Sequence, residues 1–310
     1  MTMEREMKKE PKITKGQAAK RRRTRNERLR LVLQLIFFVS MPGCFVAGFS
    51  GVKYIFRQIG TGQPLEINSF IIALILLSAF TILFGRFFCG FVCAFGSLGD
   101  FVYRLSGFLQ KKVLKRRKQF GFSEKAVMIG QKCKYLVLTA IVVTAALGLY
   151  DRFNSWNPWS AFSFFMSFRL KMSGYAGGLL LLILIVIGMA FQERFFCQFL
   201  CPMGAVFALL PQIPFAQLYR DPEKCIKGCR ACKNQCPVKI KLEPDGFLNG
   251  ECIGCERCAD VCPCGNLSRW DRKILKNEAI AVVVKALVFL LLGAAAGLCR
   301  FFTLPLIPGL

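Results

Sequence analysis

The chain has 310 residues, 54% of them hydrophobic, and a formal net charge of +25. With a mean hydropathy of +0.45, it is too apolar for an ordinary soluble protein and is predicted to be a membrane protein. Histidine is absent, which excludes histidine-ligated haem, a Rieske centre, histidine-based catalytic triads and most zinc enzyme sites. Redox chemistry would therefore depend on cysteine-held iron, a bound organic cofactor or the thiols themselves.

The first 30 residues form a basic segment, with 12 Lys and Arg residues against 4 acidic ones. No secretory hydrophobic region precedes the first apolar stretch. We interpret residues 1–30 as a disordered cytoplasmic tail that sets topology and contacts anionic lipid. Because basic residues elsewhere also gather at the ends of apolar stretches, the charge favours membrane orientation over nucleic-acid binding.

Five apolar stretches are predicted to cross the membrane as helices. They cover 31–52, 67–88, 135–150, 175–196 and 279–300. Lys285, near one end of the last stretch, can extend its amine to the membrane surface. We expect a four-span membrane domain over 31–219, a ferredoxin-like domain over 220–275 and a fifth transmembrane helix over 276–310.

The connections alternate in charge. The tail and the 104–134 connection are basic, whereas the 53–66 connection carries only Lys53 and Arg57 as cations. The positive-inside rule then places the N-terminus and residues 220–275 in the cytoplasm and the C-terminus outside the cytoplasmic (inner) membrane. A reducing cytosol suits free thiols.

The outward connection, 151–174, holds three cations (Arg152, Arg169 and Lys171) and is rich in aromatic residues. Its aromatic part is predicted to form a belt at the membrane surface or a surface that faces quinone or a partner. The residues concerned are Trp156, Asn157, Pro158, Trp159, Phe162, Phe164, Phe165 and Phe168.

The chain repeats itself with an offset of 108 residues. Residues 86–93, RFFCGFVC, match residues 194–201, RFFCQFLC, and Gly96 matches Gly204. The repeat predicts two parallel pairs of spans related by a pseudo-two-fold axis along the membrane normal. Arg86 and Arg194 would either favour the anionic form of the neighbouring thiols or anchor the helices at the interface.

Each copy of the repeat carries a C-x3-C pair, which shares one face where the segment is helical. The four thiols could hold a third iron–sulfur centre or a soft metal such as Cu(I), form dithiol–disulfide pairs, or pack as small apolar groups. These residues are Cys89, Cys93, Cys197 and Cys201, whereas Cys44, Cys133 and Cys299 are expected only to pack.

Two further cysteine runs, each followed by proline, carry the most specific signal. The second run has the bacterial ferredoxin spacing C-x2-C-x2-C-x3-C-P, and the first has one extra residue in its first gap. Zinc and disulfides fit this spacing and compartment less well. Since the fourth cysteine of each run crosses over in two-cluster ferredoxins, one [4Fe-4S] cluster would take Cys225, Cys229, Cys232 and Cys262, and the other Cys252, Cys255, Cys258 and Cys236.

Cys264 lies two residues after Cys262. It could substitute as a ligand, but a bystander role is the simpler interpretation.

Together the C-x3-C pairs and the two runs make residues 31–275 resemble the NapH/NosR group of membrane ferredoxin-type proteins, which includes CcoG-like members. The resemblance implies membrane-bound electron transfer, commonly from the quinol pool towards an extracytoplasmic reductase, and in some members copper reduction and oxidase assembly. The sequence departs from the family's C-x3-C-P motif at Ala94, although Pro202 keeps it in the second copy. Because no long flavin domain is present, a flavin would belong to another subunit.

We therefore expect an electron-transfer subunit that links quinol or a cytosolic donor to an extracytoplasmic reductase or flavoprotein. A Cu(II)-reducing assembly protein and a redox-sensing regulator are the alternatives. For quinol deprotonation the candidate groups are Asp100, Asp151 and Glu193, each of which could equally be an interfacial charge.

Overall fold

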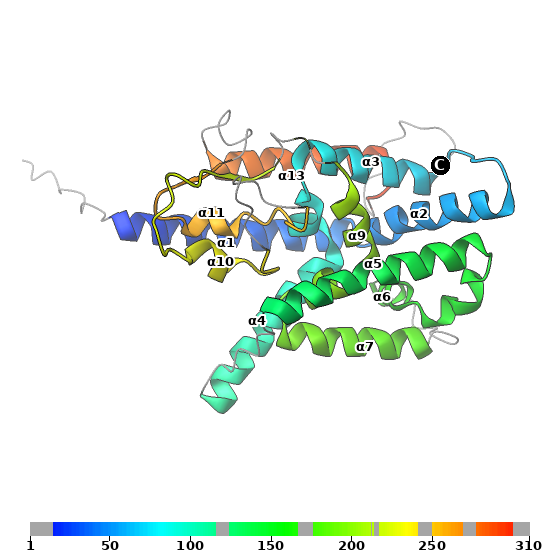
Figure 1. Ribbon diagram of the computed structural model, residues 1–310, viewed down its shortest axis with the longest axis horizontal. Coiled ribbons are helices and arrows are strands. Elements are labelled where there is room, and N and C mark those ends of the chain that lie inside the picture. The colour runs from blue at the N-terminus through cyan, green and yellow to red at the C-terminus, as the bar shows by residue number, and fades with distance from the viewer. Residues whose placement is uncertain are drawn as a thin grey trace, which may run out of the picture.

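The computed structural model describes residues 15–115, 124–166, 176–211, 213, 217–240, 250–268 and 277–299. This part of the chain is mostly helical (Figure 1). The longer helices are α1 (Lys15–Ser40), α2 (Cys44–Thr61), α3 (Ser69–Phe84), α4 (Ala94–Leu114), α5 (Glu124–Ala146), α7 (Ala176–Phe191) and α13 (Glu278–Ala295). The shorter elements are η1 (Phe88–Val92), η2 (Tyr150–Trp156), α6 (Pro158–Met166), α8 (Phe195–Phe199), α9 (Pro202–Leu209), α10 (Ala231–Gln235), α11 (Arg257–Val261), β1 (Tyr219–Arg220) and β2 (Leu267–Ser268).

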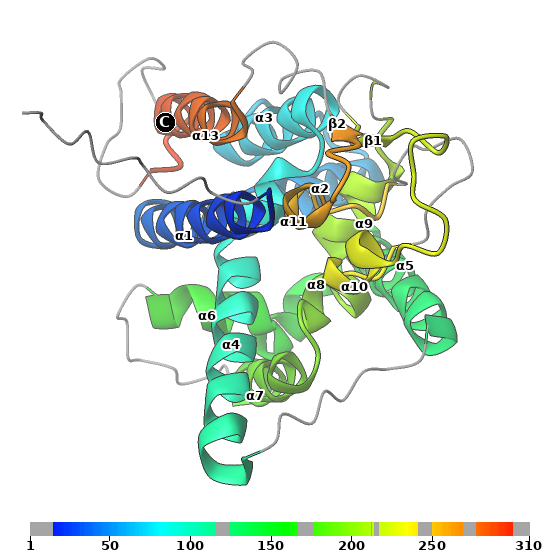
Figure 2. The same cartoon turned by 90° about the vertical axis from the view of Figure 1, so that its left-hand side faces the viewer.

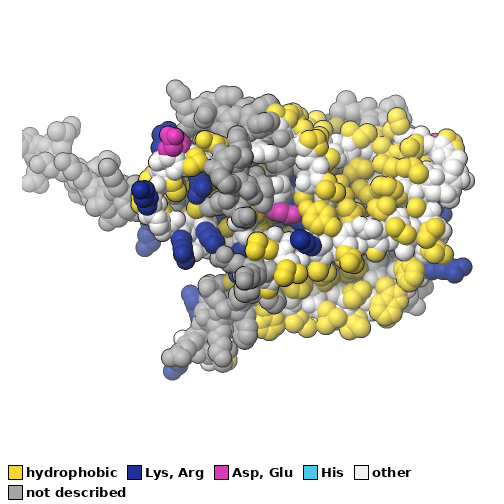
Figure 3. Space-filling model, in the orientation of Figure 1, with side chains coloured by type: hydrophobic (Ala, Val, Ile, Leu, Met, Phe, Trp, Pro, Cys, Tyr) yellow, Lys and Arg dark blue, Asp and Glu magenta, His cyan; other side chains and the backbone are white. Residues whose placement is uncertain are grey.

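Most of the long helices run roughly along the long axis of the molecule, whereas α4 leaves them at a steep angle (Figures 1 and 2). Figure 3 shows hydrophobic side chains over the surface around α2, α3 and α5 and basic ones gathered at the end that carries α10 and α11. Large apolar side chains are exposed on α3 and α5, for example Ile75 at 60% and Leu136 at 73%. An apolar outer surface is what a lipid environment requires.

Two helices within the described residues are long and apolar enough to cross a membrane, Ala126–Ala146 and Glu278–Ala295. A third span exists if α1 and α2 count as one, bent by 61° between Ser40 and Cys44. Pro42 explains the bend, because proline lacks the N–H that a continuous helix needs. The 31–52 stretch is thus not one straight helix.

The predicted 67–88 and 175–196 stretches are also interrupted. Helix α3 ends at Phe84, and Gly85 has φ +67° before the π-helical turn η1 begins. Helix α7 ends at Phe191, and Arg194 has φ +57° before α8. Since the left-handed conformation breaks a right-handed helix, α3 and α7 are shorter apolar helices of 16 residues each.

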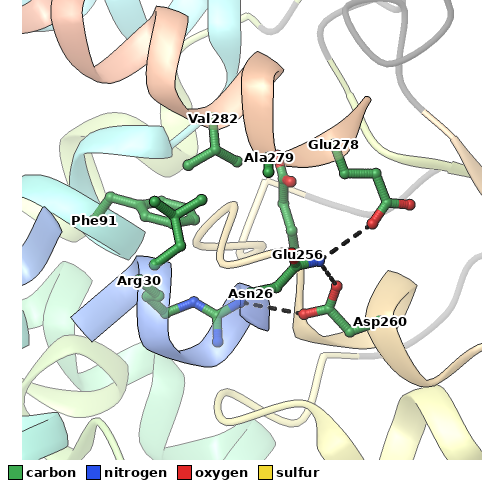
Figure 4. Close-up of a pocket in the computed structure, with 9 residues that line it drawn as sticks. Asn26, Arg30, Phe91, Glu256, Asp260, Glu278, Ala279 and Val282 are labelled. Carbon is green, nitrogen blue, oxygen red and sulfur yellow. Dashed lines mark hydrogen bonds and ion pairs between the residues drawn. The ribbon is translucent and has the colours of Figure 1, made fainter. Parts of the chain in front are cut away.

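The basic tail is helical from Lys15 onward, so the predicted disorder is wrong for residues 15–30. Helix α1 packs against α11 and α13. Figure 4 shows the contact: Asn26 Nδ2 donates to Asp260 Oδ1 (2.7 Å) and Glu278 Oε2 (3.3 Å), and Arg30 lies 3.7 Å from an Asp260 oxygen. Buried Asp260 and partly buried Glu278 across the interface hold this part of the helix.

Aromatic side chains fill the centre where the two sequence repeats meet. The Phe95 and Phe196 rings lie 4.6 Å apart, and Phe45 contacts both of these rings. Trp159 packs on Phe49 at 5.7 Å. Part of the predicted aromatic connection is therefore core rather than surface belt, while Phe168, Arg169, Lys171 and the side chains of Phe164 and Phe165 lie outside the described residues.

Gly51→Ala tests the approach of α2 to α3. A Cβ at Gly51 would clash with the Phe70 carbonyl oxygen and lie 2.9 Å from Leu74 Cβ. Overpacking should lower the free energy of unfolding by about 1–3 kcal/mol, measured as thermal stability in detergent. In the control, Gly43→Ala, a Cβ meets nothing within 4 Å. Equal stability of the two variants would contradict the assigned packing.

Candidate functional site

The two cysteine runs adopt the same local structure. Helix α10 carries Cys232 and has Cys236 as its C-cap residue, and α11 carries Cys258 and has Cys262 as its C-cap residue. Both terminal cysteines are extended, with ψ of 116° and 117°, because the proline that follows each of them disfavours the helical conformation. Strands β1 and β2 pair antiparallel, Tyr219 opposite Ser268, and close the segment at its ends.

Three thiols of the second run lie near two thiols of the first. Cys258 interacts electrostatically with Cys252, Cys255, Cys236 and Cys232. These five residues line one cavity whose apolar walls include Val238, Ile240, Ile253 and Leu267. The structure thus places Cys236 and Cys232 of the first run beside the second run. Ferredoxin spacing predicts that Cys236 shares a cluster with the second run and that Cys232 belongs to the other cluster, and this division stays a prediction.

Burial in these apolar walls raises the pKa of Cys252 to about 12 and the pKa of Cys236 to about 11. Backbone N–H groups of Gly254 and Val238 point at the two sulfurs and act in the opposite direction. The thiols are therefore neutral at pH 7 unless a metal displaces their protons. Buried cysteines with backbone donors at their sulfurs are a donor set that fits an iron–sulfur cluster.

The remaining thiols of the first run lie further out. Cys225 interacts with Cys232, and Arg220 Nη1 lies 3.9 Å from Cys225 Sγ. Cys229 closes a turn through its N–H to the Ile226 carbonyl, and the Asn266 N–H donates to Cys262 Sγ at 3.4 Å. Cys264 is exposed.

The four C-x3-C thiols also come together, from both copies of the repeat. Cys201 interacts electrostatically with Cys197, Cys89 and Cys93. The pairs do not share a face of one helix, since Cys93 and Cys201 are the extended N-cap residues of α4 and α9. Among the described residues, no three Cys, Asp or Glu side chains converge as a single metal ion would need.

Arg86 and Arg194 are fully buried, so their interpretation as interfacial anchors is wrong. Each crosses to the other copy of the repeat. Arg194 Nη1 donates to the Cys89 carbonyl at 2.6 Å and occupies the space that a Cβ at Gly96 would take. Arg86 Nη2 lies 3.1 Å from the position of a Cβ at Gly204. The matched glycines therefore make room for the opposite arginines.

Asp100 is the acid that Arg194 reaches. Arg194 Nε and Nη2 donate to its two carboxylate oxygens at 2.7 and 2.6 Å, and Gln34 donates at 2.8 Å. Burial alone would raise the pKa of Asp100, but the Arg194 and Arg257 charges outweigh it and lower the pKa. Glu193 pairs with Arg257, and exposed Asp151 pairs with Arg57 at 3.5 Å. The three candidate proton acceptors are thus ion-pair partners.

The second run lies directly on the first copy of the repeat. A Cβ at Gly90 would be 2.8 Å from the Ile253 carbonyl oxygen and 3.2 Å from Cys255 Cα. Gly254, with φ +64°, lies against the backbone of Arg86 and Phe87. In the second copy, Gln198, which matches Gly90, donates to the Pro237 carbonyl at 2.8 Å. Both copies therefore hold the cysteines of the same cavity.

Polar side chains from several helices contact residues 251–260, and sequence reasoning did not predict these contacts. Arg30 Nη2 donates to the Cys255 carbonyl at 2.6 Å, and Tyr135 Oη donates to Glu251 at 2.7 Å. Lys285 is buried, and its Nζ lies 3.1 Å from a Glu256 oxygen. In the sequence, the one indication of such a contact was Lys285 itself, because a lysine within an apolar stretch usually has a buried acidic partner.

An apolar cavity of about 430 Å³ lies beside the C-x3-C thiols. Phe195, Phe196 and Leu200, which flank Cys197 and Cys201 in the sequence, form one wall. Aromatic residues from the end of the predicted 135–150 stretch and from the outward connection form another wall: Tyr150, Phe153, Trp156 and Trp159. The volume and lining are those of a site for a small organic molecule.

Comparison with known proteins identifies relatives. A family model described as a 4Fe-4S binding domain matches residues 68–116 and 176–214, the segments that hold the C-x3-C pairs. An uncharacterized protein of Methanocaldococcus jannaschii is 32% identical over 243 residues, 77% of this chain and 85% of the relative.

More distant relatives have functional names. Ferredoxin-type protein NapH of Escherichia coli is 28% identical over 186 residues, 57% of this chain and 59% of NapH. Regulatory protein NosR of Stutzerimonas stutzeri is 25% identical over 188 residues, 59% of this chain and 24% of NosR. No solved structure matches the chain significantly.

Asp100→Asn tests the buried ion pair. Removing the charge leaves Arg194 buried without its main partner, which should cost about 3–5 kcal/mol of unfolding free energy. The control is Asp151→Asn. The Asp151 and Arg57 side chains are 69% and 58% exposed, so their ion pair should contribute only about 0–1 kcal/mol. Thermal unfolding in detergent measures both, and similar losses in the two variants would contradict the assignment.

Proposed function

Because the chain belongs to the family of membrane ferredoxin-type electron-transport proteins that includes NapH and NosR, we propose that it passes electrons between quinol or a cytosolic donor and an extracytoplasmic partner reductase or flavoprotein. One observation carries the proposal. The cysteine loop of the second run lies against the C-x3-C segment through Gly90 and Gly254, with no side-chain layer between the backbones. The thiols of the second run and those of the C-x3-C pairs are thus on segments in direct backbone contact.

Two [4Fe-4S] clusters would occupy the cysteine runs. Cys252, Cys255, Cys258 and Cys236 would hold the cluster next to the membrane repeats, and Cys225, Cys229, Cys232 and Cys262 the outer one. A bound cluster supplies one-electron redox chemistry. The chain's own residues exclude water with apolar walls and direct backbone N–H groups at the sulfurs, which tunes a cluster's potential.

The four C-x3-C thiols would hold a third iron–sulfur centre. The match of a 4Fe-4S binding model to these segments supports this assignment, as does their mutual proximity. Arg86 and Arg194 lie beside them and would compensate the negative charge of thiolate ligands.

The aromatic cavity would receive quinol or quinone. A planar head group fits between aromatic walls, and Phe195, Phe196 and Leu200 connect the cavity to the segment that carries Cys197 and Cys201. The second-run cysteines would then continue the path towards the outer cluster.

For topology, we propose two pseudo-symmetric pairs of spans, α1–α2 with α3 and α5 with α7, followed by α13. The cysteine runs lie at the end where basic side chains gather (Figure 3). The positive-inside rule places that end in the cytoplasm, with the C-terminus outside.

Iron and acid-labile sulfide analysis with EPR on anaerobically purified protein tests the cluster assignment. About eight irons per chain indicate the two ferredoxin-type clusters, and about four more indicate a [4Fe-4S] cluster at the C-x3-C site. Cys258→Ser should remove one ferredoxin-type signal, and Cys93→Ser should lower the iron content if Cys93 is a ligand. An iron-free, zinc-loaded protein that stayed active would refute electron transfer through clusters.

Cys264→Ser is the control for these variants, because Cys264 is exposed and follows the second run. Its iron content should equal that of the wild type. Unchanged iron and unchanged electron transfer in Cys93→Ser would instead assign the C-x3-C cysteines to packing.

Filling the aromatic cavity tests the quinone site. Two of the three tryptophans, Trp156 and Trp159, line the cavity, so a short-chain quinone should quench their fluorescence as it binds. Ile185→Phe places extra volume in the lining and should weaken binding roughly tenfold or more. Ile187→Phe, on the exposed face of the same helix, is the control. Equal quenching curves for the two variants would place quinone elsewhere.

A further inference from the structure

The two copies of the sequence repeat differ at one acidic position. Asp100, which pairs with Arg194, lies four residues after Gly96, and the matching position of the second copy is Ala208. The second copy therefore offers no carboxylate at this position to Arg86, although Arg86 and Arg194 are equally buried. A buried guanidinium without a partner is strongly destabilising.

The segment that carries the cysteine runs supplies the missing acid. Glu251 lies 3.7 Å from Arg86 Nη1, and the same nitrogen donates to the Gly250 carbonyl at 2.9 Å. Gly250 itself lies on the backbone of Ala208, where its Cβ would be 2.7 Å from the Ala208 carbonyl oxygen. Residues 250–251 thus occupy the region where the first copy has its own Asp100.

Glu251 is held from the other side as well. Lys134 Nζ forms an ion pair with it, and Tyr135 Oη donates to its second oxygen at 2.7 Å. Lys134 is fully buried, and the Glu251 side chain keeps 19% exposure. One carboxylate therefore joins α5 and Arg86 to the residue that precedes Cys252.

We propose that Glu251 is the positioning residue that docks the cysteine runs onto the membrane repeats, as a substitute for the acid that the second copy lacks. By fixing residues 250–251 on Arg86 and Ala208, it fixes Gly254 and Cys255 on Gly90. The inference rests on the proposed electron transfer for its functional consequence, but the docking itself does not depend on any cluster.

Glu251→Gln is the test, because it keeps the shape of the side chain and removes the charge. Amide hydrogen exchange of residues 250–260 in the full-length protein should accelerate by roughly tenfold or more. In the iron-loaded protein, the magnetic coupling between the reduced cluster of the second run and the centre at the C-x3-C thiols should weaken, with the iron content unchanged. Glu223→Gln, an exposed acid of the same segment, should leave both readouts as in the wild type.

A double variant separates docking from simple charge neutralisation. Ala208→Asp with Glu251→Gln gives Arg86 an acid within the second copy, by analogy with Asp100. Thermal stability should recover, while the exchange of residues 250–260 stays fast. Recovery of slow exchange, or slow exchange in Glu251→Gln alone, would overturn the proposal. A wild-type protein without iron would refute the proposed function, but the exchange results would still decide the docking.

Discussion

The close approach of two backbones at Gly90 and Gly254 is the contact on which the remaining arrangement depends. A side chain at either glycine would separate the Ile253–Cys255 loop from the segment that begins at Arg86. At Gly254 the positive φ of +64° adds a second reason for glycine. Without this contact, the thiols of the second run and those of the C-x3-C pairs would be two sites separated by a layer of side chains.

The arginines follow from the same geometry. The two buried arginines of the repeat each lie between thiols of two different sites: Arg86 interacts with Cys89 and with Cys252, and Arg194 with Cys197 and with Cys255. Gly96 and Gly204 are the repeat positions that leave space for them. The repeat is therefore symmetric in its cations and in its glycines, and asymmetric in the acids that neutralise them.

Sequence reasoning predicted what depends on spacing and missed what depends on distant contacts. The ferredoxin pattern predicted that Cys236 joins the second run. The structure places both Cys236 and Cys232 near Cys258, so the division of ligands between two clusters stays a prediction. The 108-residue repeat pointed to a meeting of all four C-x3-C thiols. Composition alone made residues 15–30 look like a disordered tail, because the acids that hold Asn26 and Arg30 lie more than two hundred residues away.

The predicted boundaries of the membrane spans were wrong for a local reason. Hydropathy does not register the proline at position 42 or the left-handed residues Gly85 and Arg194, so it joined segments that the backbone separates. Hydropathy also could not predict the ion pair of Lys285. A lysine in an apolar helix has the same hydropathy whether its amine is in solvent or pairs with a buried Glu256.

The balance of buried charge gives an independent argument for anionic groups at the thiol sites. Among the described residues, the buried cations are Arg30, Arg86, Lys134, Arg194, Arg257 and Lys285, whereas the buried acids are only Asp100, Glu256 and Asp260. Partly buried Glu193, Glu251 and Glu278 reduce this excess. Every one of these cations except Lys285 interacts with a cysteine of the second run or of the C-x3-C pairs.

With protonated thiols such an excess of buried positive charge is costly, since neutral sulfur does not compensate it. Thiolates bound to iron would place negative charge next to all of these cations except Lys285. Deprotonated, metal-bound cysteines would supply negative charge opposite these cations, and cluster assembly would then be coupled to stability.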